Sequence, residues 1–160
     1  MSQTLFMETT EISPDRTVGE IQKILARRGA SAVLMEYDGK GGVAAVSFRF
    51  KVGPNDLPFR LPCRWESIFT ILRRRAGVSD SSLKWMNIKR RESLEEKSKR
   101  VAWRQILRWI EAQLALVETN MVKVEEVFLP YMQTGKGGET VFELTEKRGF
   151  MALEFKGAES

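Results

Sequence analysis

The spacing of the apolar residues along the chain changes near residue 65. Before it, apolar and polar residues alternate, most clearly in VAAVSFRFKV at 43–52, where every even position is apolar. After it, in 94–119, apolar residues recur every three or four positions. The first period is typical of a half-buried antiparallel strand and the second of an amphipathic helix. The sequence therefore predicts a sheet followed by helices.

Four segments in the first part of the chain have strand character, at 4–12, 31–38, 43–52 and 57–64. An apolar face with helical spacing lies between the first two and predicts a helix over 18–28. Thr17 and Glu20 have the spacing of a capping box at its start, and Gly29 is a natural stop. Pro58 and Pro62 lack the N–H that a central strand needs, so we expect the fourth strand at a sheet edge.

Three helices are predicted after residue 65, at 66–75, 94–119 and 121–129, with a polar loop at 77–92 between the first two. Ser93 and Glu96 have the spacing of a second capping box, and Asn120 tolerates the left-handed conformation that ends a helix. The long helix has one apolar stripe, which is its expected core face: Trp103, Ile106, Leu107, Ile110, Leu114 and Val117. A further amphipathic segment in the tail, ETVFELTEKRG, is predicted to be helical.

The element order, β-α-β-β-β-α-α-α, indicates the α+β class: a small antiparallel sheet (β-α-β-β-β) packed by a long C-terminal helix and shorter helices. A length of 160 residues suits one domain with its own core. We expect that domain over 1–133 and a tail or strap over 134–160. The tail is rich in apolar side chains: Phe142, Leu144, Phe150, Leu153 and Phe155. They could join two subunits or bind their own chain, so a homo-oligomer is an open alternative.

The composition argues against an enzyme. The chain has no histidine and one cysteine, Cys63. Histidine-dependent triads, histidine general bases and structural zinc sites are therefore excluded. Glu36 and Asp38 are neighbours on one strand face and could hold magnesium, but no third acid is predicted near them. We expect no enzymatic activity, no cofactor and no metal site.

The chain has no apolar run of about 18 residues, and its start lacks the basic and apolar regions of a secretory signal. A single cysteine fits a reducing compartment. These features predict a cytoplasmic protein without a membrane partner.

Positive charge is concentrated in the middle of the chain. The net charge is +5, but residues 60–108 carry 14 Lys/Arg against 5 Asp/Glu, a net +9, and residues 65–109 contain all four tryptophans. Such asymmetry favours a polyanionic partner. Proteins that bind single strands combine a basic groove with aromatic rings on which bases stack. The predicted partner is therefore nucleic acid, with single-stranded DNA favoured.

Basic residues bracket the 77–92 loop and follow one ridge of the long helix. They are the candidates for phosphate contacts: Arg73, Arg74, Arg75, Lys84, Lys89, Arg90, Arg91, Lys97, Arg100, Arg104 and Arg108. Trp85, within the loop, is the candidate for base stacking, whereas Trp103 falls on the core stripe. A loop of this length is usually functional or disordered. Two other interpretations stay open: an ordinary solvated helix face, and a face that binds an acidic protein.

Three segments, LFMETTEI at the start, FRLPCR in the middle and RVAWRQILRWIEAQLALVE…VFLPYM, resemble a family of small proteins encoded by tailed bacteriophages and prophages. That family has no established activity, so no residue roles carry over. The resemblance implies a viral accessory protein in the bacterial host cytoplasm, expressed with replication or recombination genes. It implies equally an alternative function, a protein-interaction module that inhibits a host factor or defence system through the basic face.

Overall fold

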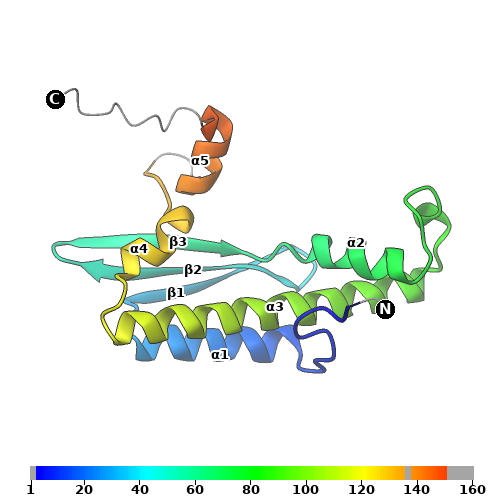
Figure 1. The fold of residues 1–160 in the computed structure, drawn as a ribbon, viewed down its shortest axis with the longest axis horizontal. Coiled ribbons are helices and arrows are strands. Elements are labelled where there is room, and N and C mark those ends of the chain that lie inside the picture. The colour runs from blue at the N-terminus through cyan, green and yellow to red at the C-terminus, as the bar shows by residue number, and fades with distance from the viewer. Residues whose placement is uncertain (1–2, 136–137, 151–160) are drawn as a thin grey trace.

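A computed structural model describes residues 3–135 and 138–150 of the chain. These residues form an antiparallel sheet in the order β1-β2-β3 together with α-helices and two short 3-10 turns, which confirms the α+β class (Figure 1). The elements in chain order are α1 (Pro14–Arg27), β1 (Ala32–Tyr37), β2 (Val43–Val52), β3 (Asn55–Pro62), α2 (Trp65–Arg75), η1 (Leu83–Trp85), α3 (Ile88–Glu118), α4 (Val124–Phe128), η2 (Leu129–Tyr131) and α5 (Val141–Arg148).

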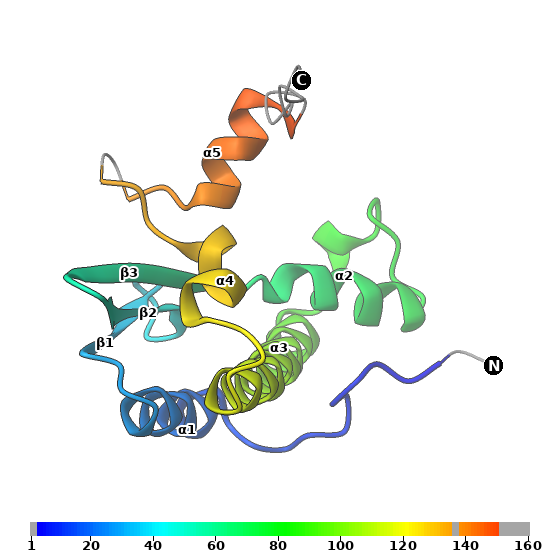
Figure 2. The same cartoon turned by 60° about the vertical axis from the view of Figure 1, so that its left-hand side comes forward.

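The fold has a sheet layer and a helix layer. Helices α1 and α3 lie beneath one face of the sheet, and α2 packs along the N-terminal half of α3 (Figures 1 and 2). The alternation of β2 explains this arrangement, because Val46, Phe48 and Phe50 are buried while Arg49 and Lys51 are exposed. The apolar face of the sheet therefore packs on the helices and forms one side of the core.

Aromatic rings connect the sheet to the helices. Phe48 is flanked by Val33 on β1 and by Phe59 on β3. Its ring stacks on that of Phe59 at 5.5 Å and meets that of Phe128 edge-on at 5.2 Å. Trp103 is 1% exposed, which confirms its predicted place in the core. Aromatic residues bury more apolar area than any other type, so this cluster supplies a large part of the packing energy.

Helix α3 begins six residues earlier than predicted. The proposed Ser93 capping box is wrong, because the cap is Asn87, whose side chain accepts hydrogen bonds from the backbone N–H groups of Lys89 and Arg90. The polar segment that the sequence assigned to the loop is thus partly helical. The apolar stripe of α3 does not reach its first turns, so the hydrophobic pattern carries no sign of them.

The start of the chain also differs from the prediction. Residues 4–12 contain no strand, and backbone hydrogen bonds from Glu8 to Leu5 (3.0 Å) and from Thr10 to Met7 (3.1 Å) close turns instead. Helix α1 starts at Pro14 with Ser13 as its N-cap, so the predicted Thr17 capping box is wrong. A proline preset to helical φ at the first position favours this earlier start.

The two edges of the sheet differ in whether further residues pair with them. Residues 132–133 pair with β3, where Gln133 N–H donates to the carbonyl of Pro58 at 2.8 Å. The chain then returns at Thr140 and forms α5, the predicted tail helix, beyond the β3 edge of the sheet (Figures 1 and 2). The proline-containing strand β3 is indeed an edge strand. Within the described residues, no strand lies beside the other edge, at β1.

Leu107 on α3 is fully buried, and Leu129 is 47% exposed. Replacing Leu107 with Ala leaves a cavity in the core and should lower the free energy of unfolding by about 2–5 kcal/mol. Leu129→Ala removes the same atoms from a partly solvated position and should cost clearly less, about 1 kcal/mol or below. Urea-induced unfolding of both variants measures the difference, and equal losses would contradict the assigned core.

Candidate nucleic-acid interface

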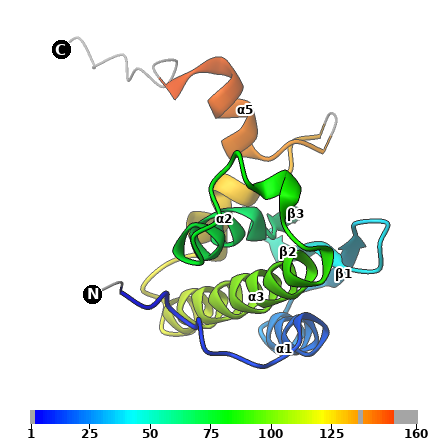
Figure 3. The same ribbon diagram turned by 90° about the vertical axis from the view of Figure 1, so that its right-hand side faces the viewer.

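One group of exposed basic residues lies at the end of the molecule where α2 and α3 form a helical hairpin (Figure 3). We call the exposed side chains of this end the basic tip: Arg74, Lys84, Trp85, Lys89, Arg90 and Arg91. The tip lies at the opposite end of the long axis from the β2–β3 turn (Figure 1). It therefore projects beyond the part of α3 that the sheet covers.

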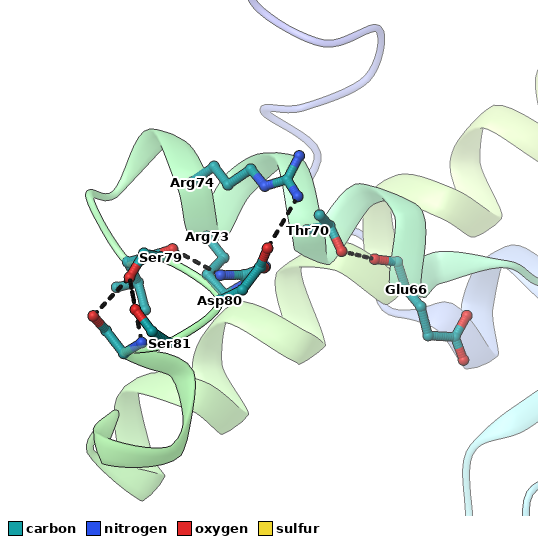
Figure 4. Close-up of polar contacts among 9 residues, drawn as sticks. Glu66, Thr70, Arg73, Arg74, Ser79, Asp80 and Ser81 are labelled. Atoms are coloured by element: carbon teal, nitrogen blue, oxygen red, sulfur yellow. Dashed lines mark hydrogen bonds and ion pairs between the residues drawn. The ribbon is translucent and has the colours of Figure 1, made fainter.

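The connection between the two helices is held by Arg73. Its side chain is 4% exposed and donates hydrogen bonds to the carbonyl of Val78, at 2.8 Å, and to the carboxylate of Asp80 (Figure 4). Arg74 pairs with the other oxygen of Asp80 at 3.4 Å. These arginines, Arg73 first, lower the pKa of Asp80 below its ordinary value. Arg73 is thus a structural residue of the loop and does not belong to the exposed surface.

Serine side chains complete the loop. The hydroxyl of Ser79 lies 3.0 Å from that of Ser81 and 2.8 Å from that of Ser82 (Figure 4). Arg90 donates from α3 to the carbonyl of Ala76 at 3.4 Å, which ties the two ends of the connection together. The loop is therefore shorter and more ordered than the predicted 77–92 segment.

Trp85 is the most exposed large apolar residue of the tip, at 78%. The ammonium of Lys84 lies 5.1 Å from the centroid of its ring, and Ile88, in the first turn of α3, is 73% exposed. Exposed tryptophans are uncommon, because burial of the ring is worth several kcal/mol. Trp85 is therefore an exposed ring among cations, the combination on which bases stack in proteins that bind single strands.

The tip carries excess positive charge. Residues 73–91 contain seven Lys/Arg and one acid, Asp80, a net +6, and Asp80 is bound by Arg73 and Arg74; the acid Glu92 follows directly on α3. Lys89, Arg90 and Arg91 stand in the first turn of α3, where the helix dipole makes cations mildly unfavourable. For Arg91, this unfavourable interaction is reduced by an ion pair with Glu95 at 3.0 Å. An anion bound at the tip would reverse the sign of these interactions.

The ridge formed by Arg100, Arg104 and Arg108 is not one surface. Arg104 is 6% exposed and donates to Glu20 at 3.0 Å and to Thr17 at 3.3 Å, so it joins α3 to α1. The Nε of Arg100 is buried and has no hydrogen-bond partner among the described residues. Arg108 is exposed and pairs with Glu111 at 2.7 Å. Packing of α1 along this side of α3 separates the three residues.

The start of the chain partly neutralises two further candidates. The carboxylate of Glu8 lies 2.9 Å from Arg75 and 3.9 Å from Lys97. It also accepts a hydrogen bond from the backbone N–H of Leu5 at 2.6 Å, and this bond, followed by Arg75, lowers the pKa of Glu8. Arg75 and Lys97 therefore hold the N-terminal segment against α2 and α3.

The other tryptophans have structural contacts. Trp109 packs edge-on against Phe128 at 5.5 Å and Tyr131 at 5.6 Å. Trp65 meets Phe69 edge-on, with the ammonium of Lys99 4.9 Å from its centroid. Since Trp103 is in the core, Trp85 is the one tryptophan whose side chain stands in solvent.

Metal binding, a reactive thiol and a membrane-spanning helix find little support in the parts of the chain that the structure describes. They contain no group of three or more His, Cys, Asp or Glu side chains that could hold a metal ion. Glu36, one of the two acids considered as magnesium ligands, forms an ion pair with Arg60 at 2.9 Å. Burial raises the pKa of the Cys63 thiol to about 12, which leaves it unreactive. None of the helices in 3–135 or 138–150 has the length and apolar character needed to cross a membrane.

Comparison with known proteins identifies no relative. No family model, no curated protein and no solved structure matches the chain.

Arg104 is expected to stabilise the fold. Arg104→Ala removes a buried cation from Glu20 and Thr17 and should lower the free energy of unfolding by about 1–3 kcal/mol. Arg108→Ala breaks an exposed pair and should change it by about 0.5 kcal/mol or less. Denaturant unfolding measures both values. A stable Arg104→Ala variant would make this residue a candidate for ligand contact again.

Attachment of the N-terminal segment should depend on pH. The pKa of Glu8 is lowered in the folded state from its ordinary value of 4.5. The stabilisation that the ionised carboxylate gives to the folded N-terminal segment is therefore fully present above pH 4.5 and is lost as the pH falls through the lowered pKa. After correction for the intrinsic rate, the Leu5 amide should exchange hydrogen faster in acid. In Glu8→Ala, which removes the acceptor, the Leu5 amide should exchange fast already at neutral pH, whereas in Glu11→Ala, at an exposed position, it should not. Unchanged protection of Leu5 in Glu8→Ala would refute the contact.

Proposed function

We propose that this protein binds nucleic acid through the basic tip, with single-stranded DNA as the preferred form. The observation that carries the proposal is Trp85, 78% exposed among the five cations of the basic tip. Phosphates supply most of the binding energy to such a surface by releasing counterions from the nucleic acid. The proposal rests on the tip, because Arg73 and Arg104 are buried and Arg75 and Lys97 are bound to Glu8.

The preference for a single strand follows from the exposed ring. A base can stack on an indole only where its own face is open, and a duplex keeps its faces stacked. Each base–aromatic stack contributes about 1–3 kcal/mol and tolerates any base. The contact is therefore expected to be independent of sequence, with neighbouring cations placed for the phosphates on either side.

One observation favours a second candidate, a protein-interaction module. Ile88 is 73% exposed close to Trp85 in sequence, and an aliphatic side chain contributes little to phosphate contacts. Together the two side chains could anchor an acidic protein with an apolar patch. For either candidate, we propose a non-enzymatic accessory role in the cytoplasm of a bacterial host; the phage resemblance stays a prediction.

Fluorescence anisotropy with a labelled single-stranded oligonucleotide at low salt tests the proposal. Wild-type protein should bind, and Trp85→Ala should weaken binding by roughly 5- to 150-fold, the equivalent of one base stack. Lys89→Ala with Arg90→Ala should lower the slope of log affinity against log salt by about 0.7 for each phosphate that the variant no longer binds. A duplex of the same sequence should compete less well.

Two matched controls are available. Phe6→Ala changes an aromatic residue that is 63% exposed but lies outside the tip, and Lys23→Ala with Arg27→Ala removes two exposed cations from α1. Neither should alter affinity by more than about twofold. Absence of binding at low salt, or equal effects in the controls, would reject the function. Binding of an acidic protein that is abolished in Trp85→Ala, without oligonucleotide binding, would support the second candidate.

A further inference from the structure

The outer edge of β1 is open. Within residues 3–135 and 138–150, β1 pairs with β2 on one side and has no strand on the other. The opposite edge of the sheet is different, because β3 contains two prolines and is partly covered by residues 132–133. An unpaired edge presents a row of backbone N–H and C=O groups that can pair with another strand.

Edge strands that avoid pairing usually contain proline, lysine or a central bulge. The sequence of β1, AVLMEY, has neither proline nor lysine. Its single charge, Glu36, is turned toward its own sheet, where it accepts from Ser47 at 2.6 Å and binds Arg60 at 2.9 Å. The bulge lies at the end of the strand, between Glu36 and Tyr37, and leaves 32–36 regular.

Apolar side chains accompany the open edge. Leu34 and Tyr37 are 63% and 60% exposed, and Val33 and Met35 on the core side are only half-buried. Side chains on both faces of the strand would therefore lose water if the sheet continued. We propose that β1 pairs antiparallel with β1 of a second copy of this chain, with Leu34 at the two-fold axis.

The register follows from the length of the regular segment. The centre of 32–36 is Leu34, so an antiparallel pair that uses the whole segment places Leu34 opposite its own copy. The same pairing sets Val33 opposite Met35 of the other chain on the core face. Both contacts are apolar, and a shift of one residue would instead turn core-side residues against outward-facing ones.

Charge is complementary in this arrangement. Glu36 would lie opposite Ala32 of the other chain, and Ala32 stands beside Arg49 on β2. The strand spacing puts Glu36 roughly 10 Å from the backbone of that arginine, on the same face, with only the small alanine between them. Glu36 keeps its bonds to Arg60 and Ser47 within its own sheet. Arg49 is 58% exposed, and its ion pair with Asp56 is long, at 3.7 Å, so the guanidinium can be shared with Glu36 of the copy. This added attraction at both ends of the strand pair favours a second copy over an unrelated strand.

An interface based on one pair of short strands is small, so the dimer should be weak and reversible. Sedimentation velocity of the full chain without nucleic acid should show a concentration-dependent rise from 18.3 kDa to twice that mass. Leu34→Lys places two ammonium groups opposite each other and should weaken dimerisation by about tenfold or more. Because Leu34 is exposed, the fold should survive, which denaturant unfolding verifies. Ile71→Lys, at a 40% exposed position on α2, is the matched control.

Cross-linking tests the register. Opposed residues of antiparallel strands have Cα atoms about 4.5–5.5 Å apart, which suits a disulfide. Leu34→Cys should therefore form a covalent dimer under mild oxidation, whereas Ile71→Cys should not. The buried Cys63 does not compete, since its thiol is unreactive. A monomer at every concentration, a dimer insensitive to Leu34→Lys, or failure of Leu34→Cys to cross-link faster than Ile71→Cys would overturn the proposal. All three results are independent of nucleic-acid binding.

Discussion

The burial of one stripe of α3 is the constraint on which the rest of the structure depends. Val101, Leu107, Ile110 and Leu114 are at most 1% exposed, and they hold α1, α2 and the sheet around a single helix of 31 residues. A helix of that length is longer than the core it serves. Its first turns therefore extend beyond the sheet and carry the cations of the basic tip into solvent.

Hydrophobic periodicity predicted most of the elements, because each strand and helix of the core has one apolar face. It failed where structure is set by local polar contacts. Asn87 caps α3 before the apolar stripe begins, and Ser13 with Pro14 starts α1 before Thr17. Residues 4–12 contain apolar residues typical of a strand, but no free edge lies where they run, and they form turns over α2 and α3 instead.

The candidate site was predictable in part, for a related reason. A polar loop with one tryptophan between basic runs pointed to Trp85, and the structure places its side chain in solvent. The four-residue spacing of Arg100, Arg104 and Arg108 placed them on one ridge of α3. A helical wheel shows that they share this ridge but not whether the ridge faces solvent or another helix. Only the position of α1 shows that Arg104 faces Glu20, 84 residues away in sequence.

That separation also bears on the order of folding. The sheet is made of consecutive hairpins and α2 adjoins α3 in sequence, so these units close short loops. Helix α1 precedes the rest of this core along the chain, and its apolar face, Val18, Ile21 and Leu25, packs on the sheet as well as on α3, which is made last among the large elements. Its packing is therefore incomplete until α3 has been synthesised, and this interval is when the nascent chain is most open to aggregation or to chaperones.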